Sequence, residues 1–130
     1  MHQRHEIIGL KRLRVGKKIV GYERQENQAP FYSKDLFWWN GERLPHSEID
    51  RAIGLRDKNN RYVFINDIIE VDTGKRFRGK KMYRIAKYQG KVGLIALKGD
   101  KHKELEHLLE IRSFEVLSFT FLHDDIPDSL

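Results

Sequence analysis

The sequence predicts a mainly β fold: a small, partly open antiparallel β-barrel, SH3-like or related, with one short inserted α-helix near residues 101–110. Three observations lead to this prediction. Strand-forming stretches recur about every ten residues, Gly and Asn turn signals separate them, and a single stretch has the apolar spacing of a helix. The 130 residues are 39% hydrophobic, which suits one globular domain covering residues 1–130.

The first half of the chain has four stretches with the composition of strands. We expect strands at residues 5–14, 17–24, 35–39 and 47–54. The first two flank Val15-Gly16, where glycine allows the positive φ of a tight hairpin turn. The polar stretch between the second and third contains Pro30, which suits a loop or an edge strand. Asn40-Gly41 is a hairpin signal after the aromatic strand.

The second half has strand pairs joined by recognisable turns. We expect strands at residues 62–65, 68–71, 81–89, 91–97 and 113–122. Residues 57–60 (Asp-Lys-Asn-Asn) form a turn, because Asp and Asn side chains bond the nearby backbone and tolerate the left-handed region. Asn66-Asp67 breaks the chain between the first two of these stretches, and residues 81–89 and 91–97 turn around Gly90. The last stretch is apolar on both alternating faces, which is typical of a central, doubly buried strand.

One stretch has helical rather than alternating spacing. Between Asp100, a candidate N-cap, and Glu110, its apolar residues are Leu105, Leu108 and Leu109. Spacings of three and four in an otherwise charged stretch predict one short amphipathic helix.

Composition excludes several classes of protein. The chain has no Cys, which removes disulfides, zinc ribbons, iron–sulfur ligation and thiol nucleophiles and fits a reducing cytoplasm. Its first residues lack a continuous apolar stretch, and no run approaches the roughly 18 apolar residues of a membrane-spanning helix. We therefore expect a cytoplasmic protein without a signal peptide and without a membrane partner.

Charge is unevenly distributed along the chain, whose formal net charge is +6. Residues 1–24 carry +5, residues 25–50 carry −3, and residues 51–74 are balanced. Residues 75–103 carry +10, and residues 104–130 carry −6. Three interpretations stay open. The basic and acidic stretches neutralise each other within the fold, they do so between subunits of a homo-oligomer, or the basic stretch faces nucleic-acid phosphates.

No catalytic, metal-binding or cofactor-binding motif stands out. The six His residues lack metal-ligand spacing; His102 and His107, five apart, fall on different faces of a helix. Neither a dinucleotide-binding nor a P-loop glycine motif occurs. Asp57 and Asp67 are candidate acid/base groups, but their positions at a turn and at a strand entry favour structural roles. We therefore expect a non-enzymatic protein without a cofactor or a metal.

Two stretches are candidate binding sites. The aromatic residues of the first are Phe31, Tyr32, Phe37, Trp38 and Trp39. These rings suit packing in a core, contact with another protein or another subunit, or stacking on nucleobases. The basic residues of the second are Lys75, Arg76, Arg78, Lys80, Lys81, Arg84 and Lys87. This density of cations suits phosphate binding, and a solvated loop between strands is the alternative.

Three blocks carry a resemblance to a known family. Residues 10–22 are similar to a basic opening strand, a glycine turn and a Gly-Tyr second strand, and residues 114–122 to a closing "EVIGNIYENPEL" segment. Residues 54–69 look like a "GL-basic-DKNG…GDIV" signature, whose turn residues here are Gly54, Asp57, Asn59, Asn60, Asn66 and Asp67. In these blocks the chain resembles the YopX-like proteins of phages and prophages of Gram-positive bacteria. Residues 25–50 and 101–110 match the family poorly.

The resemblance implies a compact, mainly β, phage-encoded protein in the cytoplasm of a bacterial host cell, and a homo-oligomer. It implies no reaction, so no catalytic residue is carried over. It also gives the signature a structural interpretation. Asn60 and Asn66 stand where the family has Gly, so both turns need a left-handed or a relaxed geometry, which Asn can supply.

These observations predict function at the level of binding. We expect a non-enzymatic phage or prophage accessory protein that acts through self-association or by binding a host or phage protein. The alternative is a nucleic-acid-binding module that uses the basic segment 75–87. An enzyme that uses Asp57 and Asp67 is a third class.

Overall fold

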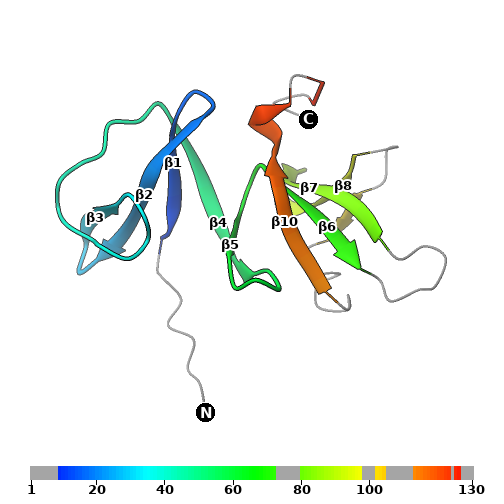
Figure 1. Cartoon of the computed structure of the whole chain (residues 1–130), viewed down its shortest axis with the longest axis horizontal. Coiled ribbons are helices and arrows are strands. Elements are labelled where there is room, and N and C mark those ends of the chain that lie inside the picture. The colour runs from blue at the N-terminus through cyan, green and yellow to red at the C-terminus, as the bar shows by residue number, and fades with distance from the viewer. Residues whose placement is uncertain (1–8, 73–79, 98–101, 105–112, 124, 127–130) are drawn as a thin grey trace, which may run out of the picture. The chain divides into compact units, whose positions relative to one another are not determined.

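The chain forms two antiparallel β-sheets in a computed structural model that describes residues 9–72, 80–97, 102–104, 113–123 and 125–126 (Figure 1). The expected mainly β fold is confirmed. The sheets stay open rather than closing into a barrel. The chain divides into two compact units, Met1–Gly54 and Leu55–Leu130.

Within the described residues, ten strands make up the two sheets. The first sheet has the order β3-β2-β1-β4-β5, and its strands are β1 (Lys11–Val15), β2 (Lys18–Glu26), β3 (Ala29–Ser33), β4 (Glu48–Arg56) and β5 (Tyr62–Phe64). The second has the order β10-β6-β7-β8-β9, and its strands are β6 (Asp67–Asp72), β7 (Lys80–Tyr88), β8 (Lys91–Ala96), β9 (His102–Glu104) and β10 (Ser113–Phe119). A 3-10 turn, η2 (Thr120–Leu122), follows β10.

The hairpins predicted at Gly16 and Gly90 are confirmed, whereas the hairpin signal at Asn40-Gly41 is wrong, because no strand follows it in the described residues before β4. β1 and β2 turn at Gly16, whose φ is +60°, and β7 and β8 turn at Gly90, whose φ is +81°. A bulge between Leu13 and Arg14 shifts the register of β1 against β2. Glycine is favoured at both turns because a Cβ is strained in the left-handed region.

A close approach of two strands fixes another glycine. A Cβ built on Gly21 of β2 would lie 2.5 Å from the carbonyl oxygen of Ser33 on β3 and would also meet the side chain of Leu44. No other residue fits there without a shift of the backbone. Gly21 therefore sets the spacing between β2 and the end of β3, where the candidate site begins.

Three buried charged residues link β1 to β4. Asp50 is 1% exposed, and its Oδ2 accepts hydrogen bonds from Nε of Arg12 at 2.9 Å and from Nε of Arg14 at 2.8 Å. Nη2 of Arg14 reaches Oδ1 of the same carboxylate at 2.9 Å. A buried carboxylate stabilises a fold only while such partners remain. The first sheet therefore depends on this charged cluster as well as on apolar packing.

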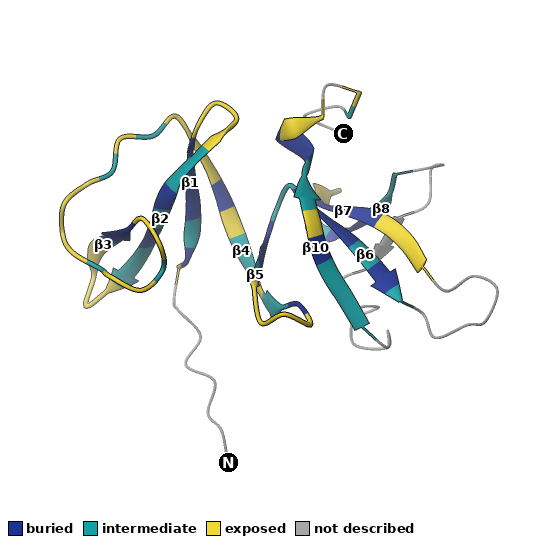
Figure 2. Ribbon diagram, viewed as in Figure 1, coloured by how far each residue is buried: buried dark blue, intermediate teal, exposed yellow. Residues whose placement is uncertain are grey.

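The core of the second sheet is formed by runs of consecutive buried residues on its central strands (Figure 2). Ile69 on β6, Ile85 on β7 and Leu94 on β8 are fully buried, and Val116 of β10 lies opposite Ile69. Each buried side chain of this type contributes about 1.5–3 kcal/mol relative to exposure.

The turn at residues 57–60 is closed by its first side chain. Oδ1 of Asp57 accepts the backbone N–H of Asn59 at 3.0 Å and that of Arg61 at 2.9 Å. The carbonyl oxygen of Asp57 accepts the N–H of Asn60, whose φ is +64°. Asn66, before β6, has a φ of +79°. Of the two expected geometries, both Asn residues have the left-handed one.

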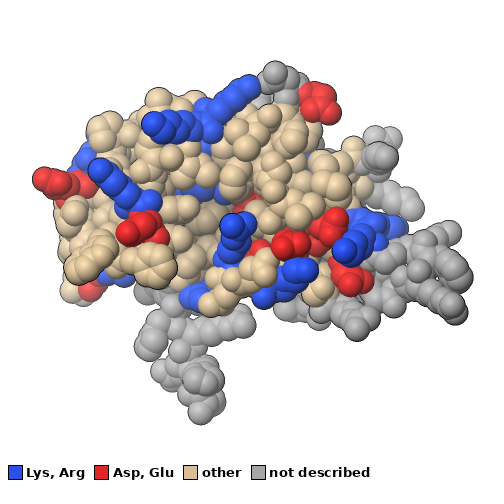
Figure 3. All heavy atoms as spheres, viewed as in Figure 1, with Lys and Arg blue, Asp and Glu red and all other residues tan. Residues whose placement is uncertain are grey.

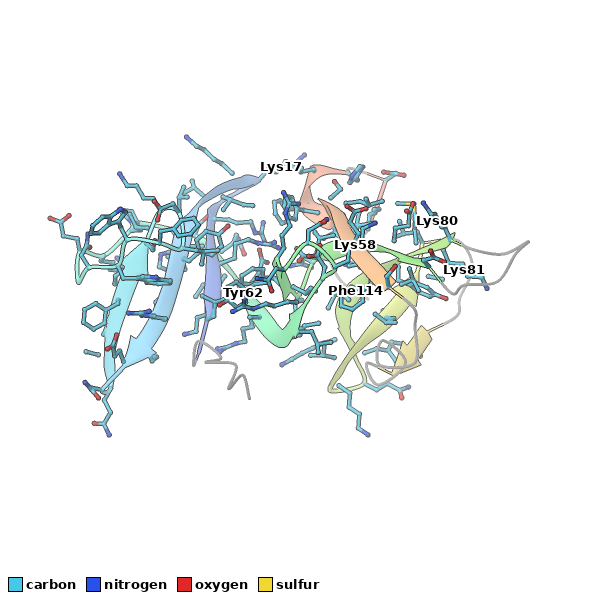
Figure 4. The ribbon with its side chains drawn as sticks, turned by 60° about the horizontal axis from the view of Figure 1, so that its bottom comes forward. Lys17, Lys58, Tyr62, Lys80, Lys81 and Phe114 are labelled. Carbon is cyan, nitrogen blue, oxygen red and sulfur yellow. The ribbon has the colours of Figure 1, made fainter. Side chains whose placement is uncertain are left out.

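The same turn covers the free edge of β10. Oδ2 of Asp57 accepts the N–H of Val116 at 2.9 Å, and the N–H of Lys58 donates to the carbonyl oxygen of Phe114 at 2.9 Å (Figure 4). β10 is thus an edge strand, and the expectation of a central strand is wrong. Its outward backbone groups are satisfied by the turn instead of by a further strand.

Two further expectations concern the last third of the chain and the membrane. The helix predicted near 101–110 is wrong at His102–Glu104, because these residues form strand β9 and pair with β8. The rest of the predicted helix lies outside the described residues. Within the described residues, no helix combines the length and apolar character needed to cross a bilayer.

Candidate interaction site

The five aromatic residues singled out in the sequence lie in and after β3, and the structure divides them by exposure. Tyr32 is buried, while Phe31 and Trp39 are half-buried. Phe37 and Trp38 are 85% and 82% exposed, the two highest values among the large apolar side chains of the described residues. We call residues 33–44, which carry both exposed rings, the aromatic loop.

Residues 34–39 of the aromatic loop form a bend and irregular backbone, so the strand expected at residues 35–39 is wrong. The hydroxyl oxygen of Ser33 accepts the N–H of Asp35 at 3.2 Å and that of Leu36 at 2.9 Å. Oδ1 of Asp35 accepts the N–H of Phe37 at 2.8 Å and that of Trp38 at 3.0 Å. Side chains that bond the nearby backbone in this way compete with strand pairing. Leu36 accordingly has a φ of +73°, outside the strand region.

The negative charge of Asp35 is favoured by these bonds. The N–H groups of Trp38 and then of Phe37 hold the pKa of Asp35 below its ordinary value of 3.8, against a smaller opposing effect of burial. The carboxylate is therefore ionised at neutral pH, in the form that braces the loop.

Trp39 anchors the aromatic loop to β2. Its Nε1 donates to the carbonyl oxygen of Leu36 at 3.1 Å, and the guanidinium of Arg24 lies 4.6 Å from the ring centroid. Arg24 is itself held by Glu26 at 2.8 Å. A cation over an indole face is attracted by the ring quadrupole. One tryptophan thus fixes the loop while its neighbour, Trp38, faces solvent.

The end of the aromatic loop returns to the edge of β3. The N–H of Tyr32 donates to the carbonyl oxygen of Asn40 at 2.7 Å, and the N–H of Asn40 donates back to Tyr32 at 3.0 Å. Backbone groups alternate in direction along a strand, so Pro30 shares the outward orientation of Tyr32, and it has no N–H to donate. The edge of β3 is therefore poorly suited to pairing with a further strand.

A cleft of about 370 Å³ lies beside the exposed rings. Its walls include Tyr32, Trp38 and Leu44, and its charged residues are Lys34, Asp35, Glu42 and Arg43. The volume is within the range of small binding pockets. Sequence reasoning missed the residues after Asn40; the signal available was the run of polar side chains that follows the Asn40-Gly41 turn.

The basic segment is only partly within the described residues, which exclude Lys75, Arg76 and Arg78. Arg84 is 4% exposed, so its side chain is not on the surface that phosphate binding requires. Lys80, Lys81 and Lys87 are exposed.

The exposed lysines of β7 do not form a single cationic face. Lys80 and Lys81 are adjacent on the strand and so point to opposite faces of the sheet (Figure 4). Nζ of Lys80 lies 3.5 Å from a carboxylate oxygen of Glu70, and Nζ of Lys58 lies 3.6 Å from Glu115. Figure 3 shows acidic and basic side chains interspersed on the viewed face.

The two carboxylates considered for acid/base chemistry have backbone partners. Asp57 is buried in the turn already described, and Oδ2 of Asp67, also buried, accepts the N–H of Phe64 at 2.8 Å. Among the described residues, no group of three or more His, Cys, Asp or Glu is placed to hold a metal ion.

No family model, curated protein or solved structure matches the chain.

Proposed function

We propose that this chain is a non-enzymatic accessory protein of a phage or prophage, of the YopX-like kind, that works by self-association or by binding another protein. The observation that carries this proposal is the exposure of Phe37 and Trp38, 85% and 82%, on an internally braced loop. Large aromatic rings are the side chains that most often dominate the free energy of protein–protein binding.

The bracing supports a binding role for these two rings. A loop that is free in solution loses conformational entropy when it docks, whereas a loop already held in place loses less. Asp35, Ser33 and Trp39 hold the aromatic loop before any partner arrives. Burial of Phe37 and Trp38 by a partner would therefore contribute to affinity at a small ordering cost.

The charge around the rings favours a protein over a nucleic acid. The charged residues of the cleft are two cations and two anions, and residues 25–50 as a whole carry −3. Binding of a phosphate backbone needs a net positive surface beside the stacking rings. The aromatic loop lacks that surface.

Two variants test the proposed function. The double variant Phe37→Ser/Trp38→Ser removes the exposed rings, and Val15→Thr/Ile49→Thr is the matched control, since those side chains are 51% and 45% exposed in the same unit. Molar mass is measured by light scattering over a hundredfold range of concentration. In parallel, a photoreactive phenylalanine at position 38 identifies neighbours in host cells, and each neighbour is purified and titrated against the chain.

We expect the ring-free variant to lose at least about tenfold in affinity for itself or for the purified partner, as hot-spot aromatics do. The control should bind as the unaltered chain does. A chain that stays monomeric at every concentration and binds none of the purified neighbours would overturn the proposed function.

A further inference from the structure

We propose that the occupant of the aromatic loop is a second copy of this chain, bound in a two-fold symmetric contact between the two aromatic loops. This inference rests on the proposed function and names its partner. Three features of the loop carry it: its shape, the signs of its charges, and the area of its exposed rings.

The aromatic loop has a projecting ring and a hollow in the same short segment. Phe37 is exposed and does not line the cleft of about 370 Å³, whereas Trp38, Asn40 and Leu44 do. The projecting ring and the hollow thus belong to one short segment. In a two-fold contact the same patch of both subunits meets. Phe37 of each copy can then enter the cleft of the other copy.

The charges of the aromatic loop are balanced, with a net charge of zero. Lys34 and Arg43 contribute two positive charges, and Asp35 and Glu42 contribute two negative charges. A surface of one sign would repel its own copy, but a balanced surface can pair each cation with an anion of the partner copy. We call these four charged residues the rim of the cleft. Because the net charge of the rim is zero, a partner with a strong net charge of either sign gains no comparable electrostatic attraction from it.

The exposed area predicts a weak dimer. A buried aromatic side chain removes about 150–250 Å² from water. Because Phe37 and Trp38 are 85% and 82% exposed, burial of these four rings from two copies would remove about 500–800 Å². Stable interfaces bury about 1,200 Å² or more, and smaller ones are transient. We therefore expect a dissociation constant in the micromolar range or weaker, with dimer forming only as the concentration rises.

Two charge reversals test the symmetry of this contact directly. Glu42→Lys makes the net charge of the rim +2, and Arg43→Glu makes it −2, starting from zero. Either variant alone then repels its own copy, whereas a mixture of the two variants brings opposite rims together. Both side chains are exposed, and mixing is also a check on folding, because a misfolded variant is not rescued by its complement.

The experiment measures self-association by sedimentation equilibrium at about 50 mM salt, where screening is weak. We expect each reversal to weaken its homodimer by about tenfold, and the equimolar mixture to recover most of the affinity of the unaltered chain. A concentration-independent monomer of the unaltered chain would overturn the second copy as partner. So would reversals that dimerise unchanged, or a mixture that fails to associate.

These outcomes separate the inference from the proposed function. If the unaltered chain is a monomer and still binds a purified neighbour through Phe37 and Trp38, the proposed function stands and the two-fold contact is overturned. If it binds no neighbour as well, both are overturned.

Discussion

Replacement of Asp57 by Ala is the sharpest test of how the second unit is held together. One carboxylate accepts three backbone N–H groups, two within its own turn and one from Val116 on β10. The substitution removes all three acceptors and keeps the chain otherwise intact. It also uncovers part of the β10 edge, because the turn lies over that edge.

The expected loss follows from the burial of each donor. The N–H of Val116 is inside the fold, and a buried donor left without an acceptor costs about 1–3 kcal/mol. The N–H groups of Asn59 and Arg61 are closer to solvent and can donate to water instead, so the loss of each of these hydrogen bonds costs about 0.5–1 kcal/mol. We expect the free energy of unfolding to fall by about 3 kcal/mol in total.

Urea denaturation and amide hydrogen exchange measure this loss. Lys58→Ala is the matched control, because it keeps the backbone N–H that bonds Phe114 and removes only a half-exposed ion pair, which contributes less than about 0.5 kcal/mol. Asp57→Asn, with a single oxygen, should fall between the two. The amide of Val116 should exchange at least about tenfold faster in Asp57→Ala.

Two results would refute this reasoning. If Asp57→Ala costs less than about 1 kcal/mol, the three bonds do not contribute as their burial predicts. If the amide of Val116 keeps its protection, the carboxylate is not its acceptor in solution.

Three other predictions follow from the first unit and from the basic segment. Because the pKa of Asp35 is lowered, its hydrogen bonds to the loop are fully present above pH 3.8 and are lost as the pH falls below that value through the folded pKa. Acrylamide quenching of tryptophan emission should therefore rise in that pH range, and Asp35→Asn should abolish the rise. Gly21→Ala should lower the free energy of unfolding by about 1–3 kcal/mol, measured in urea, because the new Cβ meets backbone; an unchanged midpoint would contradict the close approach. For nucleic acid, we expect fluorescence anisotropy to show no binding at about 200 mM salt. The contrary result would be binding whose slope of log affinity against log salt concentration falls by about two or more when Arg76, Arg78 and Lys80 are replaced by Gln, which would support the basic segment as the site.

Much of the fold was predictable because local chemistry and tertiary structure agree there. Glycine at positions 16 and 90 and asparagine at 60 and 66 stand where the backbone has a positive φ. Such residues punctuate a sequence of alternating strands, and few other residues tolerate these conformations. The β1–β2 and β7–β8 hairpins and the turn at residues 57–60 could therefore be placed from the sequence alone.

The aromatic loop was not predictable from its alternating apolar pattern. Its rings have strand propensity, but the hydroxyl of Ser33 and the carboxylate of Asp35 bond four backbone N–H groups and turn the chain. The sequence does contain the signal, a Ser and an Asp two residues apart before the rings. In this loop the side-chain-to-backbone hydrogen bonds outweigh the strand propensity of the rings.

The edge position of β10 depends on a residue far away in sequence. A strand with apolar residues on both faces resembles a central one, and only a partner for its outward backbone groups makes an edge position stable. That partner is Asp57, 59 residues before Val116. The periodicity of apolar residues is a local pattern, so it cannot predict a contact between residues this far apart in the sequence.

The buried cluster of Arg12, Arg14 and Asp50 has a consequence for how this sequence can change over time. Loss of the carboxylate alone leaves two buried guanidiniums without the acceptor they share, which typically costs about 3–5 kcal/mol. A simultaneous exchange of all three for apolar residues of similar volume is often neutral. Related sequences should therefore conserve these three positions as a set or replace them together, and an alignment should show them as co-varying.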